Sequence, residues 1–486
     1  MSPRIQATIK QSAIYTLPGI AGQLVGIVLV PIYTRIFVPA DYGVMAGVIL
    51  AAPIATFLCM FAMESGIFRF YYDAQSDRER KLIVSTGLYF VVALSVVVIG
   101  TCVMFFPEQI SQLVLHDRQY STYFILALAA VPFGLCYKLA IDVLRLKFQV
   151  MRRTMISIAH MLVNVGLSIY LVVFLRIGIM GVFLATLITN VTFMIAALLI
   201  VRNNYIWAFS WEKFKPMLRF CAPLVPTSMA FYIFQYADRY LLIRLTNLKV
   251  VGLYSIGMAL ASILYLLVSG FQMAWAPTIY SSYGEEKSKQ FYARVFNYFW
   301  ALLLFGAVGL SLFGKEAIMI LCPETYLGAY SVVPILVMSA VFFRGGPLFS
   351  FGIGIAKKTH YNLILMVIAV GLNIGLNLLL IPRYGMIGAA VATLISAVCR
   401  AASLFIISQK LYHVDYDIGA FARILAVAIA AITVANMLFS EVNWQNILIK
   451  IGLVAVYVVC LFVFHMVGKD ELIYVKNMLA KKLLKR

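Results

Sequence analysis

The sequence has little charge for its length, and acidic side chains are especially few. Only 12% of its 486 residues are charged, with 19 Asp and Glu against 39 Lys and Arg, whereas a soluble domain averages about 25% charged residues. Because 63% of the residues are hydrophobic, the chain has too little polar surface to cover a water-soluble globule. This composition excludes a soluble enzyme, a secreted module and a disordered chain, and it predicts a membrane protein.

Metal-binding and disulfide patterns are also missing. The seven cysteines are scattered, without CxxC or Cys/His spacing, and the chain has only five histidines. We therefore expect no metal, no cofactor and no disulfide framework. No cleavable signal peptide is expected, because the first apolar segment is long enough to be a span.

Long uninterrupted apolar runs, such as 82–106 and 447–466, predict helices. The strands of a membrane barrel would instead alternate apolar and polar residues. Division of the chain at charged and turn-rich clusters gives fourteen spans, which predicts an all-α polytopic membrane protein. The spans are 11–34, 42–65, 82–106, 121–144, 154–175, 178–201, 217–241, 250–275, 291–313, 329–353, 361–381, 386–409, 420–439 and 445–467.

Lysines and arginines concentrate on one side of this topology. With the N-terminus in the cytoplasm, 27 of the 39 fall on the cytoplasmic side, nine on the opposite side and three well inside spans. Such a bias follows the positive-inside rule and places both termini in the cytoplasm. Since topology accounts for most of the net charge of +20, we expect no nucleic-acid partner.

The sequence contains an internal repeat, in which spans 5 and 6 resemble spans 11 and 12. Gly178 and Gly181 match Gly385 and Gly388, and the sequence Ala-Thr-Leu-Ile occurs at both 185–188 and 392–395. A weaker match joins the tripeptides at 42–44 and 251–253. An even number of helices per copy gives both copies the same orientation, related by a pseudo-two-fold axis along the membrane normal. The predicted domains are a six-helix lobe at 1–205, a second six-helix lobe at 206–411, and two additional helices with a basic cytoplasmic tail at 412–486.

Several ionisable side chains fall at membrane depth, where they are costly and mark interior pathways. Lys138, Asp142 and Arg145 share one helical stripe of net positive charge. The Gly-Gly-Pro sequence after Arg344 predicts a helix broken at that point. We predict that a set of cations supplies successive contacts to an anion. The cations are Arg35, Arg69, Lys138, Arg145, Arg239 and Arg344. Three carboxylates, Glu64, Asp142 and Asp238, also lie at membrane depth.

Each of these residues also has a purely structural interpretation. Glu64, Arg69 and Arg145 are close enough to helix ends to extend toward the membrane surface. Arg35 could anchor a helix boundary, and Asp238 could form a structural ion pair with its neighbour Arg239. Lys138 and Arg344 are the hardest to explain structurally, because they lie well inside their spans.

The N-terminal motifs carry a family resemblance. Val30-Pro31-Ile32-Tyr33-Thr34-Arg35, with Phe37, Pro39 and Asp41-Tyr42-Gly43, is followed by Glu64-Ser65-Gly66-Ile67-Phe68-Arg69-Phe70-Tyr71. This pattern resembles the start of the Wzx-type flippases of polysaccharide biosynthesis, in the multidrug/oligosaccharidyl-lipid/polysaccharide exporter superfamily. The resemblance covers essentially the whole chain, with an Asp238-Arg239-Tyr240 element in the second lobe.

The resemblance implies a bacterial inner-membrane protein that is not an enzyme. It would move an undecaprenyl-diphosphate-linked oligosaccharide, such as an O-antigen, capsule or exopolysaccharide repeat unit, to the periplasmic leaflet by ion-coupled alternating access. The candidates for the coupling carboxylate would be Glu64, Asp142 and Asp238. Its partners would be this lipid-linked oligosaccharide, membrane lipid, a polysaccharide polymerase and a chain-length regulator.

Two other functions remain open. A small-molecule cation antiporter of the same superfamily would need an acidic cavity, whereas cations outnumber acids at membrane depth here. A polytopic glycosyltransferase or polymerase would need a sizeable extramembrane loop, and the longest segments, 66–81 and 202–216, are short.

Overall fold

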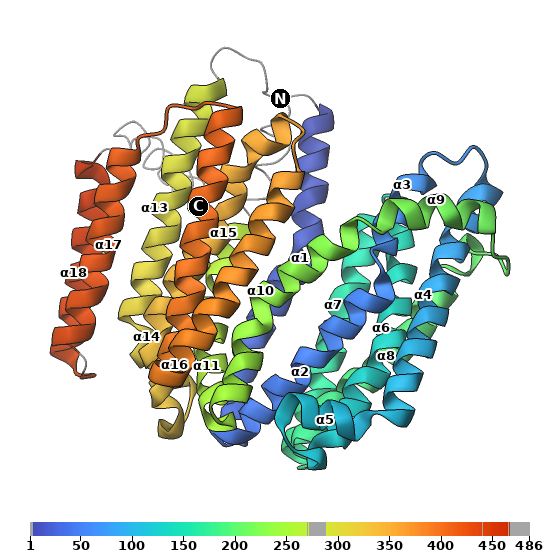
Figure 1. Ribbon diagram of the computed structural model, residues 1–486, viewed down its shortest axis with the longest axis horizontal. Helices are drawn as coiled ribbons and strands as arrows, with labels where there is room; N and C mark the ends of the chain where they lie inside the picture. The colour runs from blue at the N-terminus through green and yellow to red at the C-terminus, as the bar shows by residue number, and fades with distance from the viewer. Residues whose placement is uncertain (1–2, 270, 272–287, 440, 465, 467–486) are drawn as a thin grey trace, which may run out of the picture. The chain divides into compact units, whose positions relative to one another are not determined.

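The computed structural model describes residues 3–269, 271, 288–439, 441–464 and 466, and their regular secondary structure is helical, without strands (Figure 1). The described residues fall into two compact units, within 1–256 with 366–392 and within 257–365 with 393–486. The helices up to residue 261 are α1 (Pro3–Thr34), α2 (Pro39–Met60), α3 (Met63–Tyr71), α4 (Asp77–Phe105), α5 (Pro107–Leu115), α6 (Ser121–Leu146), α7 (Val150–Ile169), α8 (Ile179–Ile200), α9 (Trp211–Cys221), α10 (Leu224–Leu245) and α11 (Leu248–Ala261). Those that follow are α13 (Ser288–Leu312), α14 (Gly314–Leu321), α15 (Val333–Ile355), α16 (His360–Leu411), α17 (Ile418–Leu438) and α18 (Trp444–Val463).

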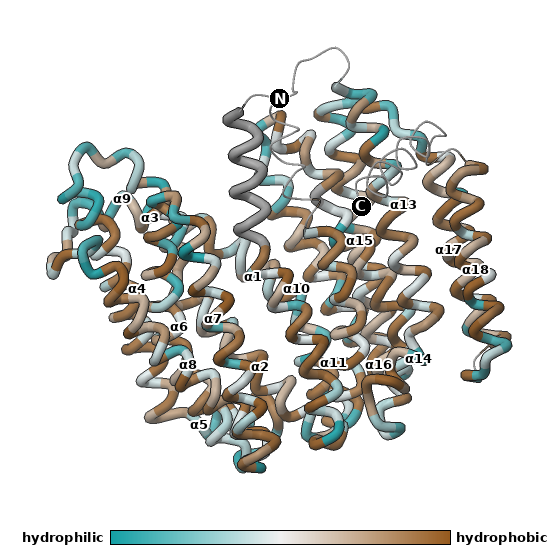
Figure 2. The backbone as a smooth tube through the Cα atoms, turned by 180° about the vertical axis from the view of Figure 1, so that it is seen from behind, coloured by the Kyte–Doolittle hydropathy of each residue, from teal (hydrophilic) through white to brown (hydrophobic). Residues whose placement is uncertain are grey.

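The long helices coincide with the predicted spans. Twelve helical segments are long and apolar enough to cross a membrane, and the bent pair α9–α10 adds a thirteenth. Helix α16 contains two predicted spans, because its backbone leaves the helical region at Gly385. Apolar residues dominate most of the helices (Figure 2). The all-α multi-pass fold is thus confirmed, while residues 272–275 of the eighth span and the tail from 467 lie outside the described residues.

Short polar residues start several of these helices. The side chain of Ser76 accepts a hydrogen bond from the main-chain N–H of Glu79 at the start of α4, and Ser210 does the same for Lys213 at α9. Each satisfies one of the unpaired N–H groups that every helix has at its start. Capped starts therefore fix where α4 and α9 begin.

The internal repeat is visible in the backbone. Gly178 has φ +74° and ψ −150°, and its repeat equivalent Gly385 has φ +54° and ψ −131°. Both conformations lie in a region open almost only to glycine. A Cβ atom on Gly181 would lie 3.1 Å from Val172, and one on Gly388 would lie 2.4 Å from the main chain of Leu380. The two hairpins therefore share a turn and a close helix approach, whereas the lobe boundaries stay a prediction.

Helices α2 and α11 approach each other until their main chains touch. A Cβ atom added to Gly43 would lie 1.9 Å from the carbonyl oxygen of Leu248. A Cβ atom added to Gly252 would likewise lie 1.9 Å from the carbonyl oxygen of Pro39. Each glycine thus contacts the residue four positions before the other. The contact is reciprocal, and the two glycines are equivalent positions in the weaker sequence match between 42–44 and 251–253.

A buried ion pair joins α14 to α18 in the second unit. Lys450 Nζ lies 2.5 Å from Glu316 Oε1, and Lys450 is only 1% exposed. The other carboxylate oxygen, Glu316 Oε2, is buried without a hydrogen-bond partner in the described part of the chain. The sequence places Lys450 on the side opposite the cytoplasm, and it gives no sign that this lysine is buried in an ion pair.

Candidate functional site

Helices α3 and α6 bring together three of the predicted site residues. Lys138 Nζ lies 2.7 Å from Glu64 Oε2, and Arg145 Nη1 lies 3.9 Å from Glu64 Oε1. The guanidinium of Arg145 also lies over the ring of Phe68, 4.7 Å from its centroid. The side chains of Lys138 and Arg145 are 47% and 44% exposed. One carboxylate therefore serves two cations whose charged side chains are accessible from outside the protein.

Asp142 is on the same stripe of α6 but has a different partner. Its Oδ1 accepts hydrogen bonds from Nε and Nη2 of Arg153 at 3.1 and 2.9 Å. Its Oδ2 is buried and finds no hydrogen-bond partner among the described residues. Arg153 was not among the predicted site residues, because it lies just before the predicted span 154–175. A short turn separates α6 from α7, so positions about equally far from that turn lie opposite each other. The similar distances of Asp142 and Arg153 from the turn would have indicated this pair.

This pair predicts a stability effect. Arg153→Met is expected to lower the free energy of unfolding by about 2 kcal/mol, because it leaves the Asp142 carboxylate buried without its cation. Denaturant unfolding of the purified protein in detergent measures this. Arg152 is exposed, so Arg152→Met is the matched control and is expected to change the free energy by less than about 0.5 kcal/mol. Equal effects of the two variants would contradict the assigned role of Arg153.

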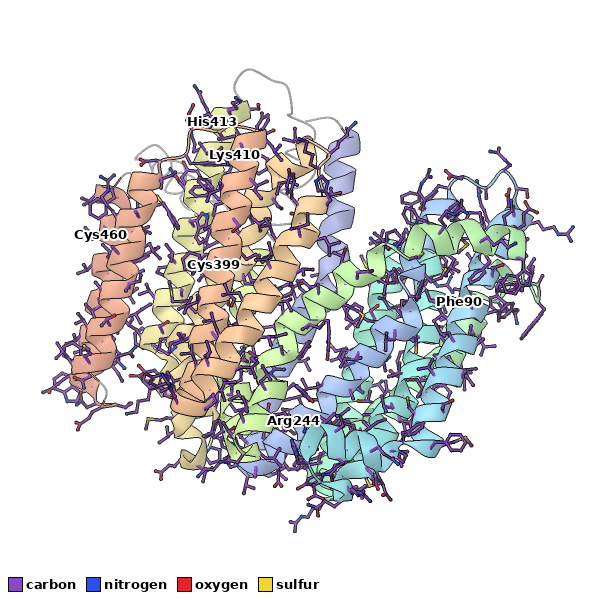
Figure 3. All side chains as sticks on the ribbon, viewed as in Figure 1. Phe90, Arg244, Cys399, Lys410, His413 and Cys460 are labelled. Atoms are coloured by element: carbon purple, nitrogen blue, oxygen red, sulfur yellow. The ribbon has the colours of Figure 1, made fainter. Side chains whose placement is uncertain are left out.

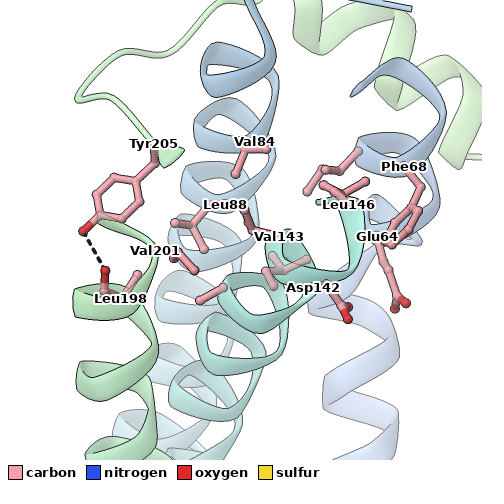
Figure 4. A pocket seen from close by; sticks show the side chains of 13 residues that line it. Glu64, Phe68, Val84, Leu88, Asp142, Val143, Leu146, Leu198, Val201 and Tyr205 are labelled. Atoms are coloured by element: carbon pink, nitrogen blue, oxygen red, sulfur yellow. Dashed lines mark hydrogen bonds between the residues drawn. The ribbon is translucent and has the colours of Figure 1, made fainter. Parts of the chain in front are cut away.

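A narrow crevice lies behind this cluster, between α3, α4, α6 and α8 (Figure 4). Glu64 and Asp142 are at its edge, and the rest of its lining is mostly apolar, including Phe68, Leu88 and Val143. Its interior has room for about one water molecule. The crevice therefore gives the charged cluster an apolar boundary on this side, and it is too small to hold a ligand.

Asp238 and Arg239 do not form the simple ion pair that their adjacency suggested. Asp238 is buried, and it accepts a hydrogen bond from the Tyr254 hydroxyl and, at 2.7 Å, one from the main-chain N–H of Arg239. The guanidinium of Arg239 lies instead over the ring of Tyr236, 5.3 Å from its centroid. Asp238 therefore holds α10 to α11, and Arg239 is partly exposed beside an aromatic ring.

Two predicted cations lie at helix ends. Arg69 is exposed and pairs with Asp73 one turn later, at 2.6 Å. Arg35 is exposed just beyond the end of α1. Neither is part of the Glu64 cluster.

A cation outside the predicted set has a structural role at the end of α10 (Figure 3). Arg244 donates to the carbonyl oxygen of Leu113 at 2.6 Å and lies 2.8 Å from His116 Nε2. It therefore ties the end of α10 to the end of α5.

Arg344 lies within the second unit, in an aromatic environment. Its guanidinium is 4.7 Å from the ring centroid of Tyr265 and 5.9 Å from that of Phe343. Arg400 of α16 lies over the same Phe343 ring, at 5.0 Å. Two cations thus share one aromatic ring, an arrangement in which cation–π attraction offsets part of their repulsion.

The predicted break after Arg344 is wrong, because α15 continues unbroken through residues 345–347. The glycines permit close packing instead of a bend. A Cβ atom on Gly345 would lie 2.7 Å from the indole of Trp300, and one on Gly346 would lie 3.1 Å from the guanidinium of Arg400. Neighbouring helices can stabilise Gly and Pro within membrane helices, so the sequence Gly-Gly-Pro alone does not identify a break.

The described residues bring no three His, Cys, Asp or Glu side chains together as metal ligands. The site geometry is that of paired charges: accessible cations, each close to a carboxylate or an aromatic ring. Such cations can bind an anion through charge-assisted hydrogen bonds.

Comparison with known proteins supplies the family and the fold. The family model described as "Polysaccharide biosynthesis protein" matches residues 32–331. No curated protein sequence matches the chain. The fold is similar to that of the lipid II flippase MurJ in its inward closed conformation, with a TM-score of 0.74, 16% identity, and 92% of this chain and 98% of that one covered. It is also similar to an inward-facing multidrug resistance MATE family transporter of the MOP superfamily, with a TM-score of 0.66, 16% identity, and coverage of 82% and 97%.

Proposed function

The chain belongs to the family of polysaccharide biosynthesis proteins, and on this premise we propose that it is a flippase for a lipid-linked oligosaccharide. The cargo is an oligosaccharide joined through a diphosphate to undecaprenol, and it moves from the cytoplasmic to the periplasmic leaflet of a bacterial inner membrane. Movement follows alternating access and is coupled to an ion, with Glu64, Asp142 and Asp238 as the candidate carboxylates. Both termini are cytoplasmic, and a polymerase and a chain-length regulator act beside it.

The observation that carries the proposal is the pair of accessible cations on α6. Lys138 and Arg145 are seven residues apart, about two helical turns, and both reach the same carboxylate. Two cations whose charged ends converge on one point match the several negative oxygens of a diphosphate. Holding such charges in a membrane span costs several kcal/mol, which argues that they serve a ligand.

The remaining predicted cations extend the proposed path of the anion. Arg239 and Arg344 each lie beside aromatic rings, and aromatic faces can stack on sugar rings while the cation holds a phosphate. Arg35 and Arg69 are exposed and would contact the anion as it enters or leaves. The polyprenyl tail needs no polar partner and stays in the lipid.

Loss of either α6 cation tests this function. Lys138→Ala and Arg145→Ala are each expected to reduce glycan export roughly tenfold or more, since each removes a charge-assisted contact. Arg344→Ala is expected to do the same. Complementation of a flippase-deficient strain, with glycan at the cell surface and protein in the membrane both quantified, measures it.

Arg118→Ala supplies the control for these variants, because Arg118 is a 71% exposed cation paired loosely with Glu108 at 3.6 Å. It is expected to export normally. Full export by Lys138→Ala and Arg344→Ala at normal protein levels would refute the cation pathway. Synthesis of a new glycosidic product by the purified protein from a radiolabelled donor would show that the protein is an enzyme instead.

A further inference from the structure

The cations proposed to hold the diphosphate already have an anion between them. Glu64 lies 2.7 Å from Lys138 Nζ and 3.9 Å from Arg145 Nη1, so its carboxylate occupies the point where the two charges converge. Glu64 is itself only partly covered, with 27% of its side chain exposed. A diphosphate cannot bind both cations until the carboxylate leaves.

Glu64 lies beside a break in the helical backbone that could move it. It is in the first turn of α3, a nine-residue helix separated from α2 by Phe61 and Ala62. Both of these residues have left-handed backbones, with φ of +49° and +54°. Such conformations cost roughly 1–2 kcal/mol for each non-glycine residue, so this joint is strained. Rotation about it would displace Glu64 without unwinding either helix.

The charges favour exchange over simple displacement. Glu64, Lys138 and Arg145 together carry one net positive charge, whereas a diphosphate ester carries at least two negative charges. The diphosphate therefore attracts the two cations more strongly than the single negative charge of the carboxylate does. The Glu64 carboxylate would in turn be repelled by a diphosphate bound beside it. When the cargo leaves, the carboxylate is still tethered nearby at high effective concentration and takes the cations back.

We infer that Glu64 is an intramolecular competitor of the cargo: it holds Lys138 and Arg145 in the empty protein, yields them to the diphosphate, and promotes release by returning. This inference rests on the proposed function and assigns Glu64 a positioning role that does not depend on ion coupling. It predicts an unusual combination, tighter binding together with slower transport, when the carboxylate is neutralised. If Glu64 were needed only for folding, its neutralisation would reduce both cargo binding and transport.

The experiment uses the full-length protein in detergent and farnesyl diphosphate as the probe. Glu64→Gln is expected to bind the probe about five- to tenfold more tightly than the wild type, because two partly exposed ion pairs no longer oppose binding. Export in cells is expected to fall by a similar factor, since the cargo is released more slowly. Glu64→Asp, which keeps the charge on a shorter side chain, is expected to restore much of the wild-type behaviour.

Glu108→Gln is the matched control, because it removes the same charge from an exposed carboxylate outside the cluster and is expected to leave both measurements unchanged. Unchanged or weaker binding by a folded Glu64→Gln protein would overturn the inference. If Lys138→Ala still weakens binding in that case, the flippase proposal survives and only the competitor role fails. If the wild type does not bind the probe and Lys138→Ala exports normally, the proposed function itself fails.

Discussion

Replacement of Lys450 by methionine is expected to lower the free energy of unfolding by about 3–5 kcal/mol, the usual cost of breaking a buried ion pair from one side. The variant would leave Glu316 buried without its cation, and Glu316 Oε2 has no hydrogen-bond partner in the described structure even in the wild type. Because the pair joins α14 to α18, α18 would lose a fixed attachment. Denaturant unfolding in detergent would show the loss.

Two further variants make this prediction specific. Removal of both charges in Glu316→Leu/Lys450→Met is expected to recover most of the lost stability, since a pair of hydrophobic residues of similar volume is often as stable as a buried ion pair. Lys81→Met removes a cation from an exposed pair with Asp77 and is expected to cost less than about 1 kcal/mol. If the double variant were no more stable than Lys450→Met, the cost would come from packing and not from the unpaired charge.

Substitution of Gly43 or Gly252 by alanine is expected to destabilise the protein by about 2 kcal/mol or more. The added methyl group would lie 1.9 Å from a carbonyl oxygen in each case, and a main chain cannot rotate away as a side chain does. Helices α2 and α11 would have to separate, and overpacking of this kind typically costs 1–3 kcal/mol. Thermal unfolding and membrane yield measure the effect.

The matched control for these substitutions is Gly100→Ala, near the C-terminal end of α4. A Cβ atom there would meet nothing within 4 Å, so alanine is expected to be neutral or to stabilise the helix by about 0.5–1 kcal/mol. Wild-type stability of both Gly43→Ala and Gly252→Ala would show that α2 and α11 are not in main-chain contact in the membrane.

The sequence was sufficient to predict the helices, because a span needs about 20 apolar residues and little else. It also predicted the hairpin repeat, since the glycines at 178 and 385 are required by backbone conformations that few other residues adopt. Packing could not be predicted in the same way. Gly345 was interpreted as part of a break, but it lies against Trp300, a contact between helices that no local pattern encodes.

Prediction of the site had the same limit. The stripe of Lys138, Asp142 and Arg145 followed from helical periodicity, which orders residues around their own helix. Periodicity does not say which helix each residue faces, so the pairing of Glu64 with Lys138 was not foreseen. The burial of Lys450 was not foreseen for the same reason, because its partner is 134 residues away.

The reciprocal contact of Gly43 and Gly252 bears on the ancestry of the chain. If the repeat began as two identical six-helix chains, the same geometry would have been an isologous dimer contact, in which one glycine met the other chain's copy of its own segment. A single substitution would then have changed the contact at two places in the interface at once, once from each chain. Duplication and fusion would remove that constraint and leave each half free to change its side of the crossing separately.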